Sequence, residues 1–340
     1  MSVTMKQFHR VRSVGVQWDD LLRDRTDASA YVQRRFQQLY ERCEALKRRK
    51  LGQHTVIFAF YDDGRPIGLL PLKYSGRRGS RTYRFLADRT IIGELDGIFS
   101  EDLSDAQLSA CMELLREELH DSKLVLNKLS EKSRLYRTFL DAGEKSAVVC
   151  VNIPFPDGYD AYYHALRKSV RQNIRTAYNR MHTDGKEFTF EMICGRPLPS
   201  KLKQKLQEVH SVRCAEMGCG RRREQTKLRL LFNRVRSRFD SIERGTDCLP
   251  NSCCAIVRID GEVAAYLRGF TTESTLVVPQ LAISSEFARY SPGVLLINET
   301  ITRLSAEDTI RNLDLSTGDE GYKLSMGGGR YNLWEITVSL

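Results

Sequence analysis

The chain has 340 residues, of which 41% are hydrophobic and 28% are charged. A chain of this size and composition can bury a core large enough for two domains, which excludes disorder over most of its length. The net charge of +10 is local, because residues 160–244 hold 20 Lys and Arg against 9 Asp and Glu. Such a field suits a polyanionic ligand, although a solvated, Arg-rich helical surface would give the same counts.

The sequence also bears on compartment and on metal binding. Residues 1–14 lack the apolar core of a secretory signal, and no stretch reaches the ~20 apolar residues that a spanning helix needs. The nine cysteines are odd in number and scattered, which predicts a reducing compartment without a disulfide framework. His210 and the five cysteines from 214 to 254 lack the paired Cys-x-x-Cys spacing of a zinc site. We therefore expect a cytoplasmic protein without a metal.

Periodicity and turn residues predict a first lobe at residues 1–153, which ends before the linker Pro-Phe-Pro-Asp-Gly. Its expected elements are a helix at 31–50, strands at 54–61 and 66–74 around the turn Asp62-Asp63-Gly64, a strand at 82–87, a capped helix at 104–120, a strand at 124–127, a helix at 133–142 and a strand at 147–153.

The second predicted lobe covers residues 154–340. Its expected elements are a long amphipathic helix at 160–183, a strand at 187–193, basic helices at about 200–217 and 226–241, strands at 253–259, 262–270 and 275–283, a helix at 292–305, a strand at 310–315, a short helix near 320–326 and a strand at 331–338. The turn Asp260-Gly261 repeats the hairpin pattern of the first lobe, which indicates an internal duplication.

Four stretches of the chain, taken together and in this order, carry a family resemblance. They are DDGRPIGLLPL at 62–72, LRKSVRQNIR at 166–175, YSPGVLL at 290–296 and LDLSTGDEGYK at 313–323. The chain resembles GNAT-superfamily acetyltransferases of the cellulose-biosynthesis family and, more distantly, Fem-type aminoacyl transferases. The resemblance implies an α/β fold of α+β mixed-sheet character, with two tandem GNAT-like lobes that are each a mixed, largely antiparallel sheet flanked by helices. It also implies an acyltransferase that uses acetyl-CoA or another acyl-CoA.

The donor site is expected at the start of the helix at 292–305. Pro292 suits the first helical turn, and free N–H groups at a helix start bind diphosphate. The resemblance implies that Ser291, Gly293 and Val294 hold the pyrophosphate of acyl-CoA, although one glycine stands where two are common. The alternative is a helix start without a ligand. Gln280 and Ala282, on the preceding strand, are further candidates for contact with the donor, and backbone N–H groups of that strand are expected to form an oxyanion hole.

Arginines on the long predicted helix are the candidates for binding an anionic substrate. Arg167, Arg171 and Arg175 stand four residues apart, so they share one helix face, and their mutual repulsion favours an anionic partner. Arg171 and Arg175 also match the family pattern. Ion pairs with acidic residues of the first lobe are the alternative. Tyr266 is a further candidate for the wall of the substrate site.

The predicted catalytic residues are Asp314, Tyr322 and Lys323, which the resemblance marks as family positions. Asp314 ends a buried strand, where a carboxylate could accept the proton of the attacking amine. Lys323 could bind a substrate phosphate, or the two residues could pair with each other and fix the loop between them. Direct attack of the acceptor on the thioester needs only a base, an oxyanion donor and good positioning.

The acceptor is expected to be a small molecule or a saccharide, namely an amine or hydroxyl of a cell-envelope saccharide or its precursor. One alternative is a Fem-like transferase that uses aminoacyl-tRNA, which is less favoured because the coiled-coil hairpin of some Fem-type proteins is missing. Another is a non-catalytic protein that binds nucleic acid or a membrane. The basic loop Arg221-Arg222-Arg223 is a candidate contact with an anionic membrane or a polyanionic acceptor. Either a monomer or a homodimer is compatible with this interpretation.

Overall fold

The computed structural model describes residues 2–23, 25, 28–88, 93–216, 249–307 and 309–340. The chain divides into two compact units: unit 1 comprises Met1–Val149 and Asn332–Leu340, and unit 2 comprises Cys150–Tyr331. Most of the last strand of the chain therefore belongs to unit 1, whereas the sequence analysis placed all of 154–340 in the second lobe. The predicted helix at 226–241 and the cluster Arg221–Arg223 lie outside the described residues.

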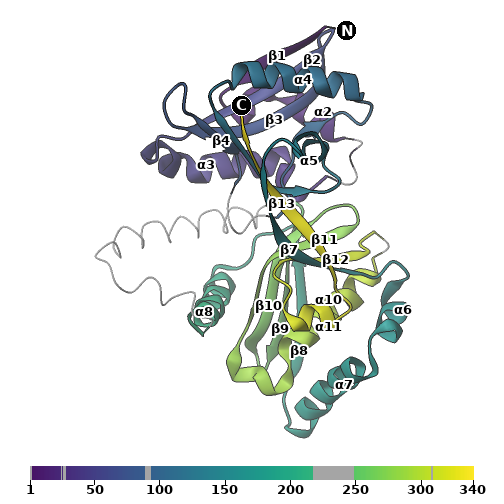
Figure 1. The fold of residues 1–340 in the computed structure, drawn as a ribbon. Coiled ribbons are helices and arrows are strands. Elements are labelled where there is room, and N and C mark those ends of the chain that lie inside the picture. The colour runs from purple at the N-terminus through teal and green to yellow at the C-terminus, as the bar shows by residue number, and fades with distance from the viewer. Residues whose placement is uncertain (1, 24, 26–27, 89–92, 217–248, 308) are drawn as a thin grey trace. The chain divides into compact units, whose positions relative to one another are not determined.

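Unit 1 is a mixed sheet with helices packed on it (Figure 1). Its strand order is β1 (Val3–Phe8), β2 (His54–Asp62), β3 (Arg65–Ser75), β4 (Thr82–Phe85), β6 (Lys123–Ser130) and β13 (Gly329–Ser339), while β5 (Ile98–Phe99) pairs with β3. All pairs are antiparallel except β4 with β6. The helices are α1 (Val11–Val14), α2 (Val16–Leu22), η1 (Ala30–Val32), α3 (Arg34–Lys50), α4 (Asp105–Glu118) and α5 (Arg134–Phe139). The sequence analysis missed β1, α1 and α2.

Two local predictions in unit 1 are confirmed. Asp63 and Gly64 both have positive φ, 46° and 80°, as the right-handed twist of a two-residue hairpin requires. At the start of α4, the Ser104 side chain accepts a hydrogen bond from the Gln107 backbone and the Gln107 side chain accepts one from the Ser104 backbone. This capping box satisfies donors that would otherwise have no partner.

Unit 2 is built on a run of mixed strands with helices on both faces (Figure 1). Its strand order is β7 (Glu144–Pro154), β12 (Asn312–Thr317), β11 (Thr275–Ile283), β10 (Glu262–Thr271), β9 (Ser252–Ile259) and β8 (Phe188–Cys194), with β11 and β12 the parallel pair. The helices are α6 (Gly158–Ala165), α7 (Lys168–Thr183), α8 (Ser200–Glu216), η3 (Ser285–Tyr290), α10 (Pro292–Ser305) and α11 (Gly321–Ser325).

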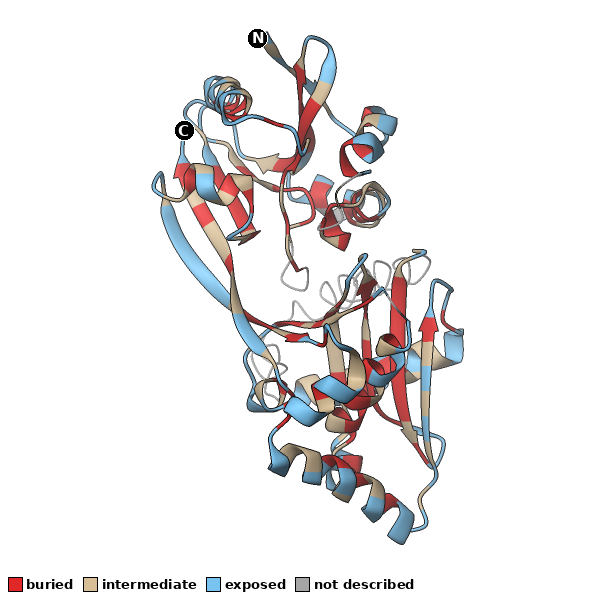
Figure 2. Cartoon of the chain, turned by 90° about the vertical axis from the view of Figure 1, so that its right-hand side faces the viewer, coloured by how far each residue is buried: buried red, intermediate tan, exposed pale blue. Residues whose placement is uncertain are grey.

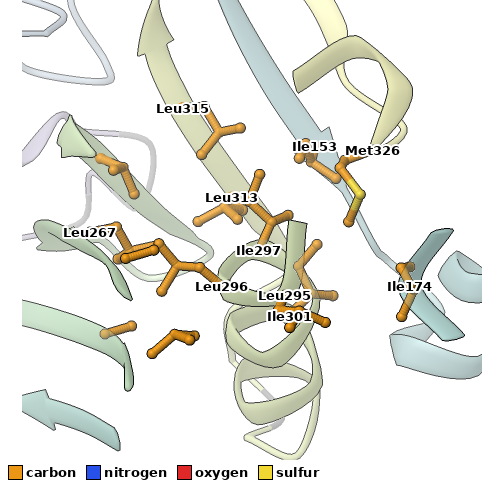
Figure 3. Close-up of a cluster of buried hydrophobic side chains, with 14 of the residues drawn as sticks. Ile153, Ile174, Leu267, Leu295, Leu296, Ile297, Ile301, Leu313, Leu315 and Met326 are labelled. Atoms are coloured by element: carbon orange, nitrogen blue, oxygen red, sulfur yellow. The ribbon is translucent and has the colours of Figure 1, made fainter. Parts of the chain in front are cut away.

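Apolar side chains cover both faces of this sheet. On one face, Leu295, Leu296 and Ile297 of α10 pack in a core with Leu313 and Leu315 of β12 (Figure 3). A smaller core lies beneath α8, where Leu206 and Val209 meet residues of β9, β10 and β11. Figure 2 shows buried residues on the strands and on the sides of the helices that face them. Each face of the unit 2 sheet therefore has its own apolar core.

The predicted helix at 160–183 is two helices, α6 and α7. The chain is extended at Leu166 (ψ 147°) and Arg167 (ψ 144°), so the helix is interrupted there. The break has a packing reason, because it lets Leu166 at the end of α6 and Ile174 of α7 enter the same core. Arg167 consequently caps α7 and does not continue a helical ladder with Arg171 and Arg175.

The cysteines also differ from expectation. Cys194 at the end of β8 and Cys253 on β9 are direct cross-strand partners and form a disulfide, with their Cα atoms 4.1 Å apart. Antiparallel pairing brings the two positions together although they are far apart in sequence. Spacing alone does not reveal such a pair.

Candidate functional site

Strand β11 has one open edge in unit 2. It pairs in parallel with β12 only from Thr275 to Val277, opposite Asn312 to Asp314, yet it continues to Ile283. Beyond Val277 no strand pairs with this edge in the described part of the chain, while β10 covers the opposite edge. Backbone N–H and C=O groups must find partners, so an open edge of this kind is suited to bind an extended ligand.

A β-bulge lies at the start of the open edge. Val278 and Pro279 of β11 stand opposite the single residue Gly269 of β10. A Cβ atom at Gly269 would lie 2.0 Å from the Val277 carbonyl oxygen, so the bulge requires glycine there. The extra residue reverses the alternation of side chains. Leu276 before the bulge and Val278 within it enter the α10-side core, whereas Ala282 after the bulge enters the core beneath α8.

Helix α10 starts beside the far end of β11. Ser291 is left-handed (φ 49°, ψ 49°), Pro292 is the first helical residue, and no side chain caps the helix. The N–H groups of Val294 and Leu295 both donate to the Ser291 carbonyl, at 3.0 and 3.2 Å. Among the described residues, the Gly293 N–H thus lacks a protein acceptor at the positive end of the helix dipole, where an anion is favoured.

Gly293 has a packing role that the sequence analysis did not foresee. It is buried, and a Cβ atom at this position would lie 2.4 Å from Cδ1 of Ile283. The missing side chain thus leaves room for the Ile283 side chain at the end of β11. This contact holds the start of α10 against the strand that has the open edge.

Asp184, just after α7, fixes the segment before α10. Its carboxylate lies 3.3 Å from the Arg289 guanidinium and accepts a hydrogen bond from the Tyr290 hydroxyl at 2.8 Å. Arg180 of α7 donates to the Arg289 carbonyl at 3.1 Å. Sequence reasoning missed Asp184, because its role depends on contacts with residues more than a hundred positions away.

Asp314 lies where β11 and β12 separate. Leu313 and Leu315 enter the α10-side core, so alternation directs Asp314 to the opposite face. Its carboxylate accepts hydrogen bonds from the Ser316 N–H at 2.7 Å and from the Tyr331 hydroxyl at 2.6 Å. Burial raises the pKa of the Asp314 carboxyl, and these two hydrogen bonds oppose that change. A carboxylate with a raised pKa is a stronger base than an exposed one.

Ser316 has a left-handed backbone (φ 54°), which is uncommon for a residue with a side chain. Leu315 and Ser316 together oppose Val151 of β7, so a second β-bulge directly follows Asp314. The bulge points the Ser316 N–H back at the Asp314 carboxylate. The position of the carboxylate is thus set by the backbone.

Lys323 is buried and fully engaged. Its ammonium donates to the carbonyls of Leu315, Thr317 and Gly318 at 2.8 to 3.1 Å, and it lies 2.9 Å from a carboxylate oxygen of Glu320. An ammonium has three N–H donors. Lys323 therefore fixes the loop after β12, which is one of the two roles expected for it, but it does so through carbonyl groups and not by pairing with Asp314.

Tyr322 is half-buried beside the α10-side core. Burial, aided by the negative charge of Glu320, raises the pKa of its hydroxyl, so the phenol stays protonated at neutral pH. A phenol with a raised pKa is a weaker acid than an exposed tyrosine, so Tyr322 keeps its proton and can act as a hydrogen-bond donor. Asp314, Tyr322 and Lys323 thus lie on β12 and α11, around a single loop.

The other candidates are distributed differently. Tyr266 and Ala282 are cross-strand partners, each 1% exposed, and their side chains belong to the core beneath α8. Gln280 on the same face accepts a hydrogen bond from Arg268 at 3.5 Å. Arg171 donates to the His164 carbonyl at 3.2 Å, whereas Arg175 is exposed and has no side-chain partner in the described residues.

The described residues contain no group of three His, Cys, Asp or Glu side chains that could hold a metal ion. His210 and Cys214 are one helical turn apart on α8, with Nε2 and Sγ 3.4 Å from each other. None of the described helices combines the length and the apolar character needed to cross a membrane.

Comparison with solved structures identifies the fold. The chain is similar to a tandem GNAT protein of the clavulanic acid pathway (TM-score 0.51, 11% identity, covering 99% of this chain and 98% of that one) and to FemX (0.51, 11%, 98% and 98%). It is also similar to the C-terminal domain of a protein from Agrobacterium fabrum described as a lysylphosphatidylglycerol synthetase (0.53, 13%, 95% and 91%). The molecule thus has the mixed α/β fold of tandem GNAT proteins.

The sequence then assigns the domain. Residues 168–324 match the family model described as acetyltransferase (GNAT) domain. This stretch contains β11, α10 and Asp314, so the open edge and the uncapped helix start lie within a GNAT acetyltransferase domain. The match supports an enzyme that contains a GNAT-type acetyltransferase domain. The curated proteins include no match to the sequence.

Proposed function

We propose that unit 2 transfers an acyl group, in the simplest case acetyl, from acyl-CoA to an amine or hydroxyl of a cell-envelope saccharide or its precursor. The observation that carries the proposal is the open edge of β11, which ends at an uncapped helix start within a GNAT domain. The pantetheine arm of CoA carries amide groups that can pair with a strand edge, and its pyrophosphate suits the positive end of α10. The residues present therefore fit acyl-CoA.

In this mechanism the acceptor attacks the thioester carbon directly. Backbone N–H groups of β11 beyond the bulge stabilise the negative charge that develops on the carbonyl oxygen. Asp314 accepts the proton that the acceptor loses as the new C–N or C–O bond forms. The C–S bond then breaks, and the CoA thiolate leaves and takes up a proton from solvent.

The proposal places the reaction in the cytoplasm, although the Cys194–Cys253 disulfide does not match the reducing compartment that the cysteine pattern predicts. It needs no second copy of the chain, because Asp314, Tyr322 and the start of α10 all belong to unit 2. A saccharide acceptor rests on the sequence resemblance alone. Aminoacyl-tRNA is the second candidate donor, and the observation in its favour is that α7 contains basic residues and no acidic residue.

Calorimetric titration with acetyl-CoA tests the proposal, with two variants of Ser291. Ser291→Asp places a negative charge at the helix start, which suits the helix but repels a pyrophosphate. Ser291→Asn introduces a side chain of nearly the same size as aspartate but without a charge, and it is the matched control. We expect the Asp variant to weaken binding at least about tenfold, equivalent to ~1.4 kcal/mol, and the Asn variant to bind like the wild type.

Acceptors are then screened by thiol release, with amino sugars, neutral sugars and nucleotide-linked saccharides. A folded wild type that does not bind acetyl-CoA would rule out the proposed donor and make aminoacyl-tRNA the next donor to test. Equal binding by both Ser291 variants would move the pyrophosphate site away from α10.

A further inference from the structure

Two exposed loops meet at one end of the unit 1 sheet. The first loop joins α3 to β2, and the second joins β3 to β4. His54 at the start of β2 pairs with Tyr74 near the end of β3, and their rings lie 5.3 Å apart. Ser75 in turn pairs with Thr82 at the start of β4. The register therefore places residues 49–53 and 76–81 at the same end of the sheet.

The tips of these loops carry four cations and one apolar side chain. We call Arg49, Lys50, Leu51, Arg77 and Arg78 the basic edge. All five side chains are exposed, and none of the four cations forms an ion pair with a described residue. The sequence contains no Asp or Glu at 45–61 or at 64–87. The loops thus carry positive charge without a local counter-charge.

Helix electrostatics accounts for only part of this charge. Arg49 and Lys50 lie in the last turn of α3, where cations interact favourably with the helix dipole. Arg77 and Arg78 have no such reason, because they lie between strands. Their turn is tightly built: Gly76 has φ 99°, and a Cβ atom there would lie 2.8 Å from the Ser80 carbonyl oxygen. The turn therefore presents both guanidinium groups at its tip.

Leu51 distinguishes between the two kinds of polyanion that could bind here. Its side chain is 56% exposed, and it directly follows the two cations at the end of α3. Nucleic acid phosphates would pair with the cations and leave Leu51 in water. A bilayer with anionic headgroups offers both charge for the cations and an apolar interior for the leucine.

We propose that the basic edge docks unit 1 on the surface of an anionic membrane. The four cations approach the headgroups, and Leu51 enters the boundary between headgroups and acyl chains. Lys123 at the start of β6 is not included, because Asp121 beside it offsets its charge. The docking does not depend on the reaction proposed for unit 2.

Sedimentation with lipid vesicles tests this docking on the full-length protein. The probes are vesicles of phosphatidylcholine alone and of phosphatidylcholine with one quarter phosphatidylglycerol. We expect binding to the anionic vesicles only, and weaker binding at 0.5 M salt. Replacing Arg77 and Arg78 in the double variant R77E/R78E should lower the partition coefficient at least roughly 25-fold, about fivefold for each lost cation, and the two new carboxylates add repulsion from the headgroups. Leu51→Asn should lower it a few-fold at unchanged charge.

The control is the double variant K132E/R137E, which makes the same change of charge on exposed residues beyond the other end of β6. It should bind like the wild type, and circular dichroism checks that all variants fold. Equal binding to both kinds of vesicle, or an equal loss in the control, would overturn the proposal. So would tight binding of a 20-nucleotide RNA by a protein that ignores the anionic vesicles.

Discussion

The two units contain the same strand–helix–strand segment in two different states. In unit 2, β11, α10 and β12 leave an open strand edge and a helix start without a side-chain cap. In unit 1, β4 and β6 also pair in parallel over only three positions, from Thr82 to Arg84. There, however, the Asn127 amide donates to the Asp88 carboxylate beyond the end of the pairing, and α4 is capped by its own Ser104. The two segments share a backbone arrangement. They differ in a few side chains, which in unit 1 occupy the strand ends and the helix start.

The correspondence extends to the β-bulges. Asn127 and Lys128 oppose one residue of β13, as Leu315 and Ser316 oppose one residue of β7. The second residue of each bulge is left-handed, with φ 60° at Lys128 and 54° at Ser316. The position of Asp314 corresponds to Leu126, which is fully buried. Unit 1 therefore keeps the backbone of the site and lacks its carboxylate.

The largest expected effect is a loss of activity when the carboxylate of Asp314 is removed, but not when that of Asp88 is removed. Asp314→Asn removes the proposed base and should lower kcat/KM about 10²–10⁴-fold, since an amide cannot accept the proton. Asp88→Asn makes the same change in unit 1 and should leave kcat/KM unchanged. The measurement is acetyl-CoA-dependent thiol release with an acceptor from the screen. Equal losses in both variants would contradict the assignment of the active site to unit 2.

The loops after β12 and β6 are fixed by different chemistry. Lys323 holds the first through carbonyl groups, whereas in unit 1 the Ser133 hydroxyl donates to Asp96 at 2.7 Å. Lys323→Met keeps the length of the side chain and removes its donors, so buried carbonyls lose their partners. We expect a loss of about 3 kcal/mol in the free energy of unfolding. Denaturant titration measures it, and an unchanged midpoint would show that the ammonium does not fix the loop.

The helix starts provide the next test. Ser104→Ala removes the cap of α4 and should cost about 1 kcal/mol of stability without affecting acetyl-CoA binding. Ser291→Asp should do the reverse, with weaker binding and no loss of stability. Thermal unfolding and calorimetry on both variants give the comparison. A binding defect in the Ser104 variant would indicate a donor site in unit 1.

The smallest expected effect is a shift in a pH profile. The Tyr331 hydrogen bond lowers the pKa of Asp314, so Tyr331→Phe should raise that pKa. The proposed base acts when it is deprotonated. The acidic limb of kcat/KM against pH should consequently move to higher pH, while the plateau stays close to that of the wild type. A uniform loss at every pH would show that Tyr331 has only a structural role.

Local patterns predicted much of the fold. The hairpin at Asp63-Gly64, the capping box at Ser104 and the helix from Pro292 each depend on residues a few positions apart, and all three are confirmed. The break at Leu166 was not predictable, because the apolar face of the predicted helix at 160–183 continues through it. Only tertiary packing favours the interruption. The disulfide between Cys194 and Cys253 likewise depends on strand register.

The sequence was sufficient to locate the candidate site, but not to identify all the residues that build it. The Pro292 helix start and the strand that contains Asp314 were found from local signals, although β12 continues past Asp314 to Thr317. Tyr331 and Asp184 were missed, since each acts through a partner distant in sequence. Tyr266 and Ala282 were expected in the site, and their side chains fill the core beneath α8. For Ala282 the reason is the bulge in β11, which reverses the alternation of side chains. Spacing in the sequence contains no sign of that reversal.

The position of β13 has a consequence for how the chain is made. Residues 332–340 complete the sheet of unit 1 along β6, although they are synthesised last. A nascent chain that has emerged as far as residue 331 exposes the unpaired edge of β6, which is an aggregation hazard. Unit 1 can therefore reach its final form only after all of unit 2 has been translated, and removing the last nine residues would harm the unit that lies first in the sequence.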